Sequence, residues 1–332
     1  MIKGLPRFVH VRGGAYFFMP GIRALRFLSR EPKELGSPYA APAPLASAGP
    51  ASLKLRAFQA VNSVIVAAIR LTRLPIFVPL RNAFDGLFRG LIVAAAQALI
   101  NLRREDEGLG VAEERELPQE AEVVREITQQ MTQFLYKHYR HGIAERAGNT
   151  KTYGLVRASF EVSADLRQDL WVGVFQPGRR YAAYVRFGGP GPLAPPDLED
   201  NGVLSIGVKL LGVPGDKLID DEKFTQDFTG ISAPTFTTPT IYENLKLQQY
   251  VYRDIGALYF LNPLDGHYLD AVMQGIYAKT HGSPLEATYW SCVPFLFGAH
   301  RAVKYAFRPL SREKTRVPWH PSANYLREAM VK

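Results

Sequence analysis

A change of hydrophobic period near Gly148 limits the fold of this chain more than any other feature. Up to this point apolar residues recur every three or four positions, as on one face of a helix. Beyond it they gather in short runs rich in Val, Tyr and Phe, which are typical of strands. We predict strands over 153–162, 170–175, 181–187, 203–212, a short segment around Phe228, and 301–308.

Helical segments stand on both sides of these strands. Pro118 occupies a position that tolerates proline at the start of a helix, and an apolar stripe continues from Val123 to Leu135. Two more helices are predicted over 242–261 and 264–279. A run of strands followed by helices predicts an α+β fold, in which the antiparallel sheet is curved or forms part of a barrel.

Most of the positive charge lies in the N-terminal third. The 332-residue chain has a formal net charge of +9, but residues 1–104 hold 15 Lys and Arg against 3 Asp and Glu. The other residues are nearly neutral, with 25 basic and 28 acidic side chains. The basic excess therefore bears on where the protein docks, and no nucleic-acid partner is expected.

The sequence divides into three parts. A stretch rich in Pro, Ala and Ser over 36–51 is typical of a linker. We therefore assign 1–51 to a basic, Pro/Ala-rich N-terminal segment, 52–117 to an apolar and basic helical extension, and 118–332 to the main domain.

The extension contains two predicted helices, over 52–74 and 80–104. No transmembrane helix is expected, because arginines and prolines cut the apolar run 61–80 and the run 90–100 is too short. Three interpretations stay open for 52–104: an amphipathic pair on an anionic membrane, an extension packed on the main domain, or a transit peptide. The expected location is cytoplasmic, with the first interpretation placing the chain peripherally on the inner membrane surface.

Several kinds of chemistry are excluded by residue content. A single cysteine, Cys292, rules out an intramolecular disulfide and a Cys-based metal site or Fe–S cluster. The common motifs of serine hydrolases, zinc proteases, P-loop proteins and dinucleotide-binding proteins are missing from the sequence. His138 and His141 are three residues apart but lack a third ligand nearby, so we expect a solvated helix end rather than a metal site.

Several short motifs follow one another along the main domain. They are R-x-x-N-x-K at 146–151, F-E-V at 160–162, V-R-F at 185–187, G-x-K-L at 207–210, Q-D-F at 226–228 and Pro234. Further runs are K-L-L-G-V-P-G at 209–215, Y-W-S at 289–291 and V-K-Y at 303–305. Together they resemble the front half of haem catalases, and more closely the short catalase-like haem proteins of bacteria, over residues 118–330.

The resemblance implies a catalase-like antiparallel β-barrel, complete or open, that binds haem and acts on hydrogen peroxide or on organic or lipid hydroperoxides. It assigns Arg146 and Arg186 to the haem propionates, which suits the bidentate guanidinium. Tyr289 matches the spacing of the tyrosinate iron ligand. The arginine that the family places four residues before that ligand is Leu285 here.

The distal side of the implied site departs from the family. Asn149 stands at the position of the distal histidine, Ser232 at that of the distal asparagine, and Gly188 where a serine follows the V-R-F motif. Cleavage of the O–O bond needs a base, and neither Asn149 nor Ser232 takes up a proton near neutral pH. Weak or lost catalase activity is therefore expected.

Two other functions remain open. One is a non-catalytic haem- or lipid-binding module held at a membrane. The other is a half-barrel that needs another chain, including a homo-oligomer, because an open barrel exposes strand edges.

Overall fold

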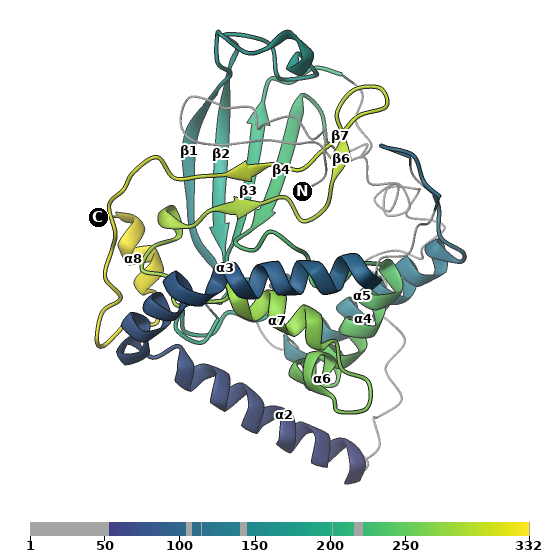
Figure 1. The fold of residues 1–332 in the computed structure, drawn as a ribbon, viewed down its shortest axis with the longest axis vertical. Coiled ribbons are helices and arrows are strands. Elements are labelled where there is room, and N and C mark those ends of the chain that lie inside the picture. Colours follow the sequence, from purple (N-terminus) through teal and green to yellow (C-terminus); the bar gives the residue numbers. More distant parts are fainter. Residues whose placement is uncertain are drawn as a thin grey trace.

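The computed structural model describes residues 53–103, 108–113, 115–139, 145–200, 202–215 and 222–331. The predicted basic segment 1–51 lies outside these ranges, as do His141, Asp220 and Asp221. Within them the fold is α+β, as predicted: a curled antiparallel sheet with helices gathered mainly at one end (Figure 1).

The sheet has six strands in the order β1-β2-β3-β4-β5-β8 and forms a half-barrel. Long strands make its first part: β1 Thr152–Glu161, β2 Arg180–Gly188, β3 Ser205–Leu211 and β4 Thr225–Ile231. Two-residue strands, β5 Tyr289–Trp290 and β8 Ala306–Phe307, continue it, and β6 Phe295–Leu296 pairs separately with β7 Ala302–Val303. In Figure 1 the C-terminal segment crosses one face of the long strands.

Helices account for the rest of the regular structure. They are α2 Leu53–Thr72, α3 Val78–Arg103, α4 Glu120–His138, α5 Ile241–Tyr252, α6 Gly256–Leu261, α7 Tyr268–Tyr277 and α8 Tyr325–Val331. Three short 3₁₀ turns lie at η1 Pro75–Phe77, η2 Gln168–Leu170 and η3 Pro284–Glu286. The predicted helix over 242–261 is two helices, because the chain breaks at Asp254, which has a φ of 60°.

Alternate residues of the long strands fill one core. Phe160, Phe187, Val208 and Phe228 are buried on the same face of the sheet. The predicted strand 170–175 is wrong: Gly173 has a φ of 55° and turns the chain. Its apolar residues Leu170, Val174 and Phe175 are buried because they cover this core from a loop, which explains their strand-like composition.

Candidate functional site

The register of the sheet brings the predicted haem-site residues to one end. A row of paired residues crosses the strands there: Thr152, Gly188, Ser205, Ile231 and Trp290. Arg186, Ser232 and Tyr289 lie within two positions of this row in sequence, and Asn149 precedes it by three. Motifs that are up to 140 residues apart therefore share one sheet end.

Arg186 and Arg146 form a positive patch at this end. The Arg186 guanidinium donates from Nε and Nη2 to Thr152 Oγ1, at 3.0 and 2.8 Å, and from Nη2 to the Asn149 carbonyl at 2.6 Å. Burial and the nearby charge of Arg146 lower the pKa of Arg186. Neither arginine forms an ion pair within the described ranges, so the patch suits a carboxylate or phosphate.

The two predicted distal residues lie in different surroundings. Asn149 is exposed, with a φ of 47°, and its carbonyl is bound by Arg186. Ser232 is buried; its Oγ accepts from the Leu204 N–H at 2.8 Å, and its own N–H donates to the Leu204 carbonyl at 2.8 Å. The Ser232 side chain therefore ties the ends of β3 and β4 together, with its Oγ accepting one backbone hydrogen bond.

Tyr289 is a core residue in this structure. Its hydroxyl donates to the Pro284 carbonyl at 2.7 Å, and its ring lies 5.9 Å from that of Phe187. Burial raises the pKa of the phenol. An iron ligand of this type is a tyrosinate, so ligation would require breaking this hydrogen bond and ionising a phenol that burial keeps neutral. As placed, Tyr289 does not fit the iron of a haem. Arg186 has its Nε and Nη2 groups bonded to Thr152 and Asn149, so a carboxylate of a haem would meet its Nη1 group and Arg146.

A buried ion pair beside this sheet end was not predicted. Lys151 Nζ lies 2.8 Å from Asp197 Oδ1, and the Asp197 side chain is fully buried. Asp197 Oδ2 accepts from the Leu326 N–H at 2.8 Å, which fixes the start of α8. Forty-six positions separate the two charges in sequence, and no local motif joins them.

A second unpredicted group surrounds Asp200. Burial raises the pKa of this carboxyl to about 6, although the Gly191 N–H donates to it at 3.1 Å. The Tyr153 hydroxyl donates to the Asp200 carbonyl at 3.1 Å, and Arg73 from the extension donates to the Glu199 carbonyl at 2.7 Å. The loop after β2 therefore connects the sheet end to the helical extension.

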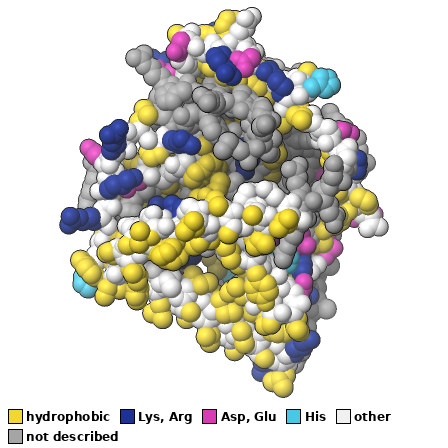
Figure 2. Space-filling view, in the orientation of Figure 1, with side chains coloured by type: hydrophobic (Ala, Val, Ile, Leu, Met, Phe, Trp, Pro, Cys, Tyr) yellow, Lys and Arg dark blue, Asp and Glu magenta, His cyan; other side chains and the backbone are white. Residues whose placement is uncertain are grey.

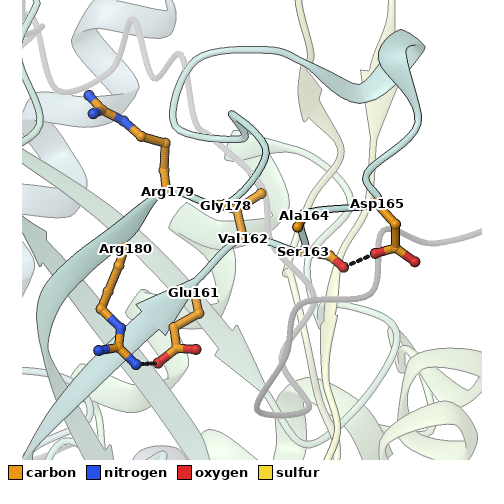
Figure 3. A pocket seen from close by; sticks show the side chains of 8 residues that line it. All are labelled: Glu161, Val162, Ser163, Ala164, Asp165, Gly178, Arg179 and Arg180. Atoms are coloured by element: carbon orange, nitrogen blue, oxygen red, sulfur yellow. Dashed lines mark hydrogen bonds and ion pairs between the residues drawn. The ribbon is translucent and has the colours of Figure 1, made fainter.

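A hollow at the opposite end of the sheet contains charged side chains (Figure 3). Arg180 is paired with Glu161, and Ser163 bonds to Asp165, while Arg179 points away from both. None of the predicted site residues lines it. Nor does any group of three or more His, Cys, Asp or Glu side chains in the described ranges have an arrangement that would hold a metal ion.

Three polar side chains of α2 bind the rest of the protein. Gln59 Nε2 donates to the Arg253 carbonyl at 3.0 Å, and Asn62 Oδ1 accepts from the Ala257 N–H at 2.9 Å. Near the end of the helix, Arg70 forms an ion pair with Glu199 at 2.8 Å.

Helix α3 follows the same pattern. Arg81, Asp85 and Arg89 repeat every four residues, and Asp85 pairs with both arginines. Arg81 Nη2 donates to the carbonyls of Gly275 and Ile276 in α7, at 2.7 and 3.0 Å. The charged stripe of α3 is thus partly buried against the body, where Arg81 and Asp85 are bonded and the Nε of Arg89 has no hydrogen-bond acceptor among the described residues.

The outward side of these helices is apolar. We call it the outward face; its exposed members include Val61, Val64 and Leu71 of α2 and Leu80, Phe84, Leu87, Phe88, Leu91 and Leu99 of α3. Figure 2 shows apolar side chains spread along this part of the surface. The inward side is mixed, because Ile92, Val93, Ala96 and Ile100 of α3 pack with Met273 and Ile276 of α7. A surface helix of a soluble protein has its apolar stripe on the core and polar residues outside, whereas here apolar residues also cover the outside.

By length and composition both helices are able to cross a membrane. The two segments are Leu53–Thr72 and Pro75–Leu102, and 6% of each apolar window is buried. The helices begin and end at other residues than the apolar runs 61–80 and 90–100 on which the expectation of no transmembrane helix rested, and the finding concerns length and composition alone. Pro75 and Pro79 fall in η1 and the first turn of α3, so they separate two helices and interrupt neither.

No protein-family model matches this chain, and no curated protein matches it either. The resemblance to catalase-like proteins therefore stays a prediction that rests on the motifs themselves. The exposed apolar face of α2 and α3 is independent of that resemblance.

Proposed function

We propose that this protein works at a membrane surface, where α2 and α3 dock a catalase-like body on anionic lipid. The observation that carries the proposal is the exposed apolar face of the two helices. Their charged and amide side chains bind the body, while Leu, Phe and Val side chains face outwards. A large exposed apolar surface of this kind marks a protein or membrane interaction site.

The charge of the extension favours anionic lipid over a protein as the partner of this face. Residues 53–103 contain seven Lys and Arg but one acidic residue, Asp85. Four of the arginines are bonded to the body or to Asp85, whereas Lys54 and Arg56 are exposed near the start of α2. An apolar helical face combined with basic residues is the pattern by which interfacial helices bind anionic lipid, since buried apolar area and electrostatic attraction add.

Sedimentation with vesicles tests this proposal on the full chain. We expect more protein to bind vesicles that contain an anionic phospholipid than neutral ones. Binding should fall as salt rises, because the Debye length shrinks from about 10 Å at 0.1 M to about 3 Å at 1 M ionic strength. Equal binding to neutral and anionic vesicles, or no binding to either, would contradict the proposal.

Haem binding by the body is the second candidate function, with hydrogen peroxide or an organic or lipid hydroperoxide as substrate. It is favoured by the patch of Arg146 and Arg186, which suits two propionates and has no carboxylate partner within the described ranges. Haem would supply the redox chemistry that splits peroxides. Asn149 and Ser232 provide no base near neutral pH, so the expected turnover is weak.

Absorption titration with haem tests this second function. We expect a Soret band that saturates, and about tenfold or weaker affinity in Arg146→Ala and in Arg186→Ala, because hydrogen bonds to charged groups are worth about 1.5–3 kcal/mol. Arg179→Ala, an exposed arginine at the far end of the sheet, is the matched control. Unchanged affinity in both site variants would remove the assignment. A Soret band that neither shifts nor sharpens when the chain is added would mean that the chain does not bind haem.

A further inference from the structure

Helices α2 and α3 are long and apolar enough to cross a bilayer, but their contacts with the body point to a different placement. We infer that the pair lies in the plane of one leaflet of an anionic membrane, and that the α6–α7 loop inserts beside it as a second contact. This inference rests on the proposed membrane function and specifies how that function is carried out.

The turn between the two helices is fixed to the body. Arg73 Nη1 donates to the Glu199 carbonyl at 2.7 Å, and Thr280 Oγ1 donates to the Arg73 carbonyl at 2.8 Å. In a hairpin that crosses the bilayer, the turn emerges on the side opposite to its two open ends. The body would then have to lie on that far side.

The open ends are fixed to the same body. Gln59 near the start of α2 binds the Arg253 carbonyl, and Ala96 and Ile100 near the end of α3 pack on Met273 and Ile276 of α7. One folded body cannot lie on both sides of a bilayer. A spanning hairpin is therefore incompatible with these contacts.

The contacts along α3 also show that the body cannot enter the membrane together with this helix. From Arg81 to Ile100 the helix rises about 28 Å, close to the thickness of the hydrocarbon core of about 30 Å. Its partner α7 has 10 residues and is about 15 Å long, too short to span. The loops on either side of α7 would have to enter lipid, which irregular backbone exposed to lipid does not do.

The α6–α7 loop beside the hairpin also exposes apolar side chains, next to the ion pair of Asp265 with Lys246. Helix α6 contacts α2, and α7 contacts α3, so this loop lies beside the pair (Figure 1). Leu264 at its tip is 96% exposed, and Leu261, Tyr268 and Val272 around it are also exposed. Two apolar elements on one side of the body give a broad docking surface, as an in-plane placement requires.

Fluorescent labels at single cysteines distinguish the two placements. In the full chain with Cys292→Ala, an NBD label is placed by separate substitutions at Ile76 in the turn, Leu87 in the middle of α3, Leu102 at its end, and Leu264. Leu310, which is 63% exposed far along the chain, is the matched control site. Each labelled protein is added to the outside of preformed anionic vesicles.

We expect a blue shift of the emission at the first four sites and none at Leu310. Dithionite, which does not cross the bilayer, should then reduce all four labels from the outside. Protection of the Ile76 label, with a blue shift at Leu87, would mean a spanning hairpin and overturn the inference while membrane binding itself stands. A Leu264 label that stays in water would remove the second contact. If vesicles shift the emission at none of the sites, the proposed function is overturned as well. If the shift appears without lipid and grows with protein concentration, the surface binds a second copy of the chain instead.

Discussion

Replacing Leu87 and Leu91 together with Asp is expected to weaken binding to anionic vesicles by about 100-fold or more. Burying one Leu side chain is worth about 1.5–3 kcal/mol, and both residues project from the outward face, 72% and 70% exposed. The substitution removes two such contributions and adds two negative charges near anionic headgroups. Vesicle sedimentation at fixed salt measures the loss.

The folded protein should tolerate this change. Because both side chains are exposed in the structure, thermal unfolding in the absence of lipid should be nearly unchanged, as is usual for surface substitutions. Leu310→Asp, with a similarly exposed leucine elsewhere on the chain, should bind vesicles like the wild type. A double variant that binds normally would show that the outward face is not the docking surface. One that unfolds would show that a protein surface covers it.

Much of the fold follows from periodicity alone. The strands over 153–162, 181–187 and 203–212 are confirmed with small shifts, because alternation along a half-buried strand is strictly local. The short strands β5 and β6 were not predicted. Each has two residues and is defined by its pairing with a neighbouring strand, so no local sequence pattern predicts it.

The helical extension shows a different limit. Both helices were predicted from apolar content, but composition does not tell which side of a helix meets the protein. That side is decided by distant backbone groups, such as the carbonyls of Arg253 and Gly275 that receive Gln59 and Arg81. Only the assembled fold reveals that these polar side chains face inwards.

For the candidate haem residues, the sequence predicted the position in the sheet but not the direction of the side chains. Sequence order predicted that Arg186 and Tyr289 share a site, and the register does bring them to one sheet end. It could not predict the orientation of each side chain. Tyr289 turns into the core and bonds to Pro284, whereas Arg186 closes the loop that contains Asn149.

Asp197→Ala is expected to destabilise the protein by about 3–5 kcal/mol, the range found when one partner of a buried ion pair is removed. The Asp197 side chain is fully buried, and the Lys151 side chain nearly so. Its loss leaves the Lys151 ammonium with only the carbonyls of Pro195 and Ala323 as hydrogen-bond partners. The Leu326 N–H at the start of α8 loses its acceptor as well. Denaturant unfolding of the full chain measures the difference.

A second substitution separates the unpaired charge from the loss of packing. Lys151→Met in the Asp197→Ala background removes the buried ammonium, so the double variant should be more stable than Asp197→Ala alone. The remaining difference in unfolding free energy between this double variant and the wild type then measures the loss of the hydrogen bond from the Leu326 N–H and of the packing of α8 against β1. Met330 lies close to Gly154 in that packing. A double variant less stable than the single one would mean that Lys151 stabilises this sheet end through the two carbonyls and not through Asp197. In that event the loop after β2, in which Glu199 contacts the α2–α3 hairpin, would be fixed chiefly by Lys151.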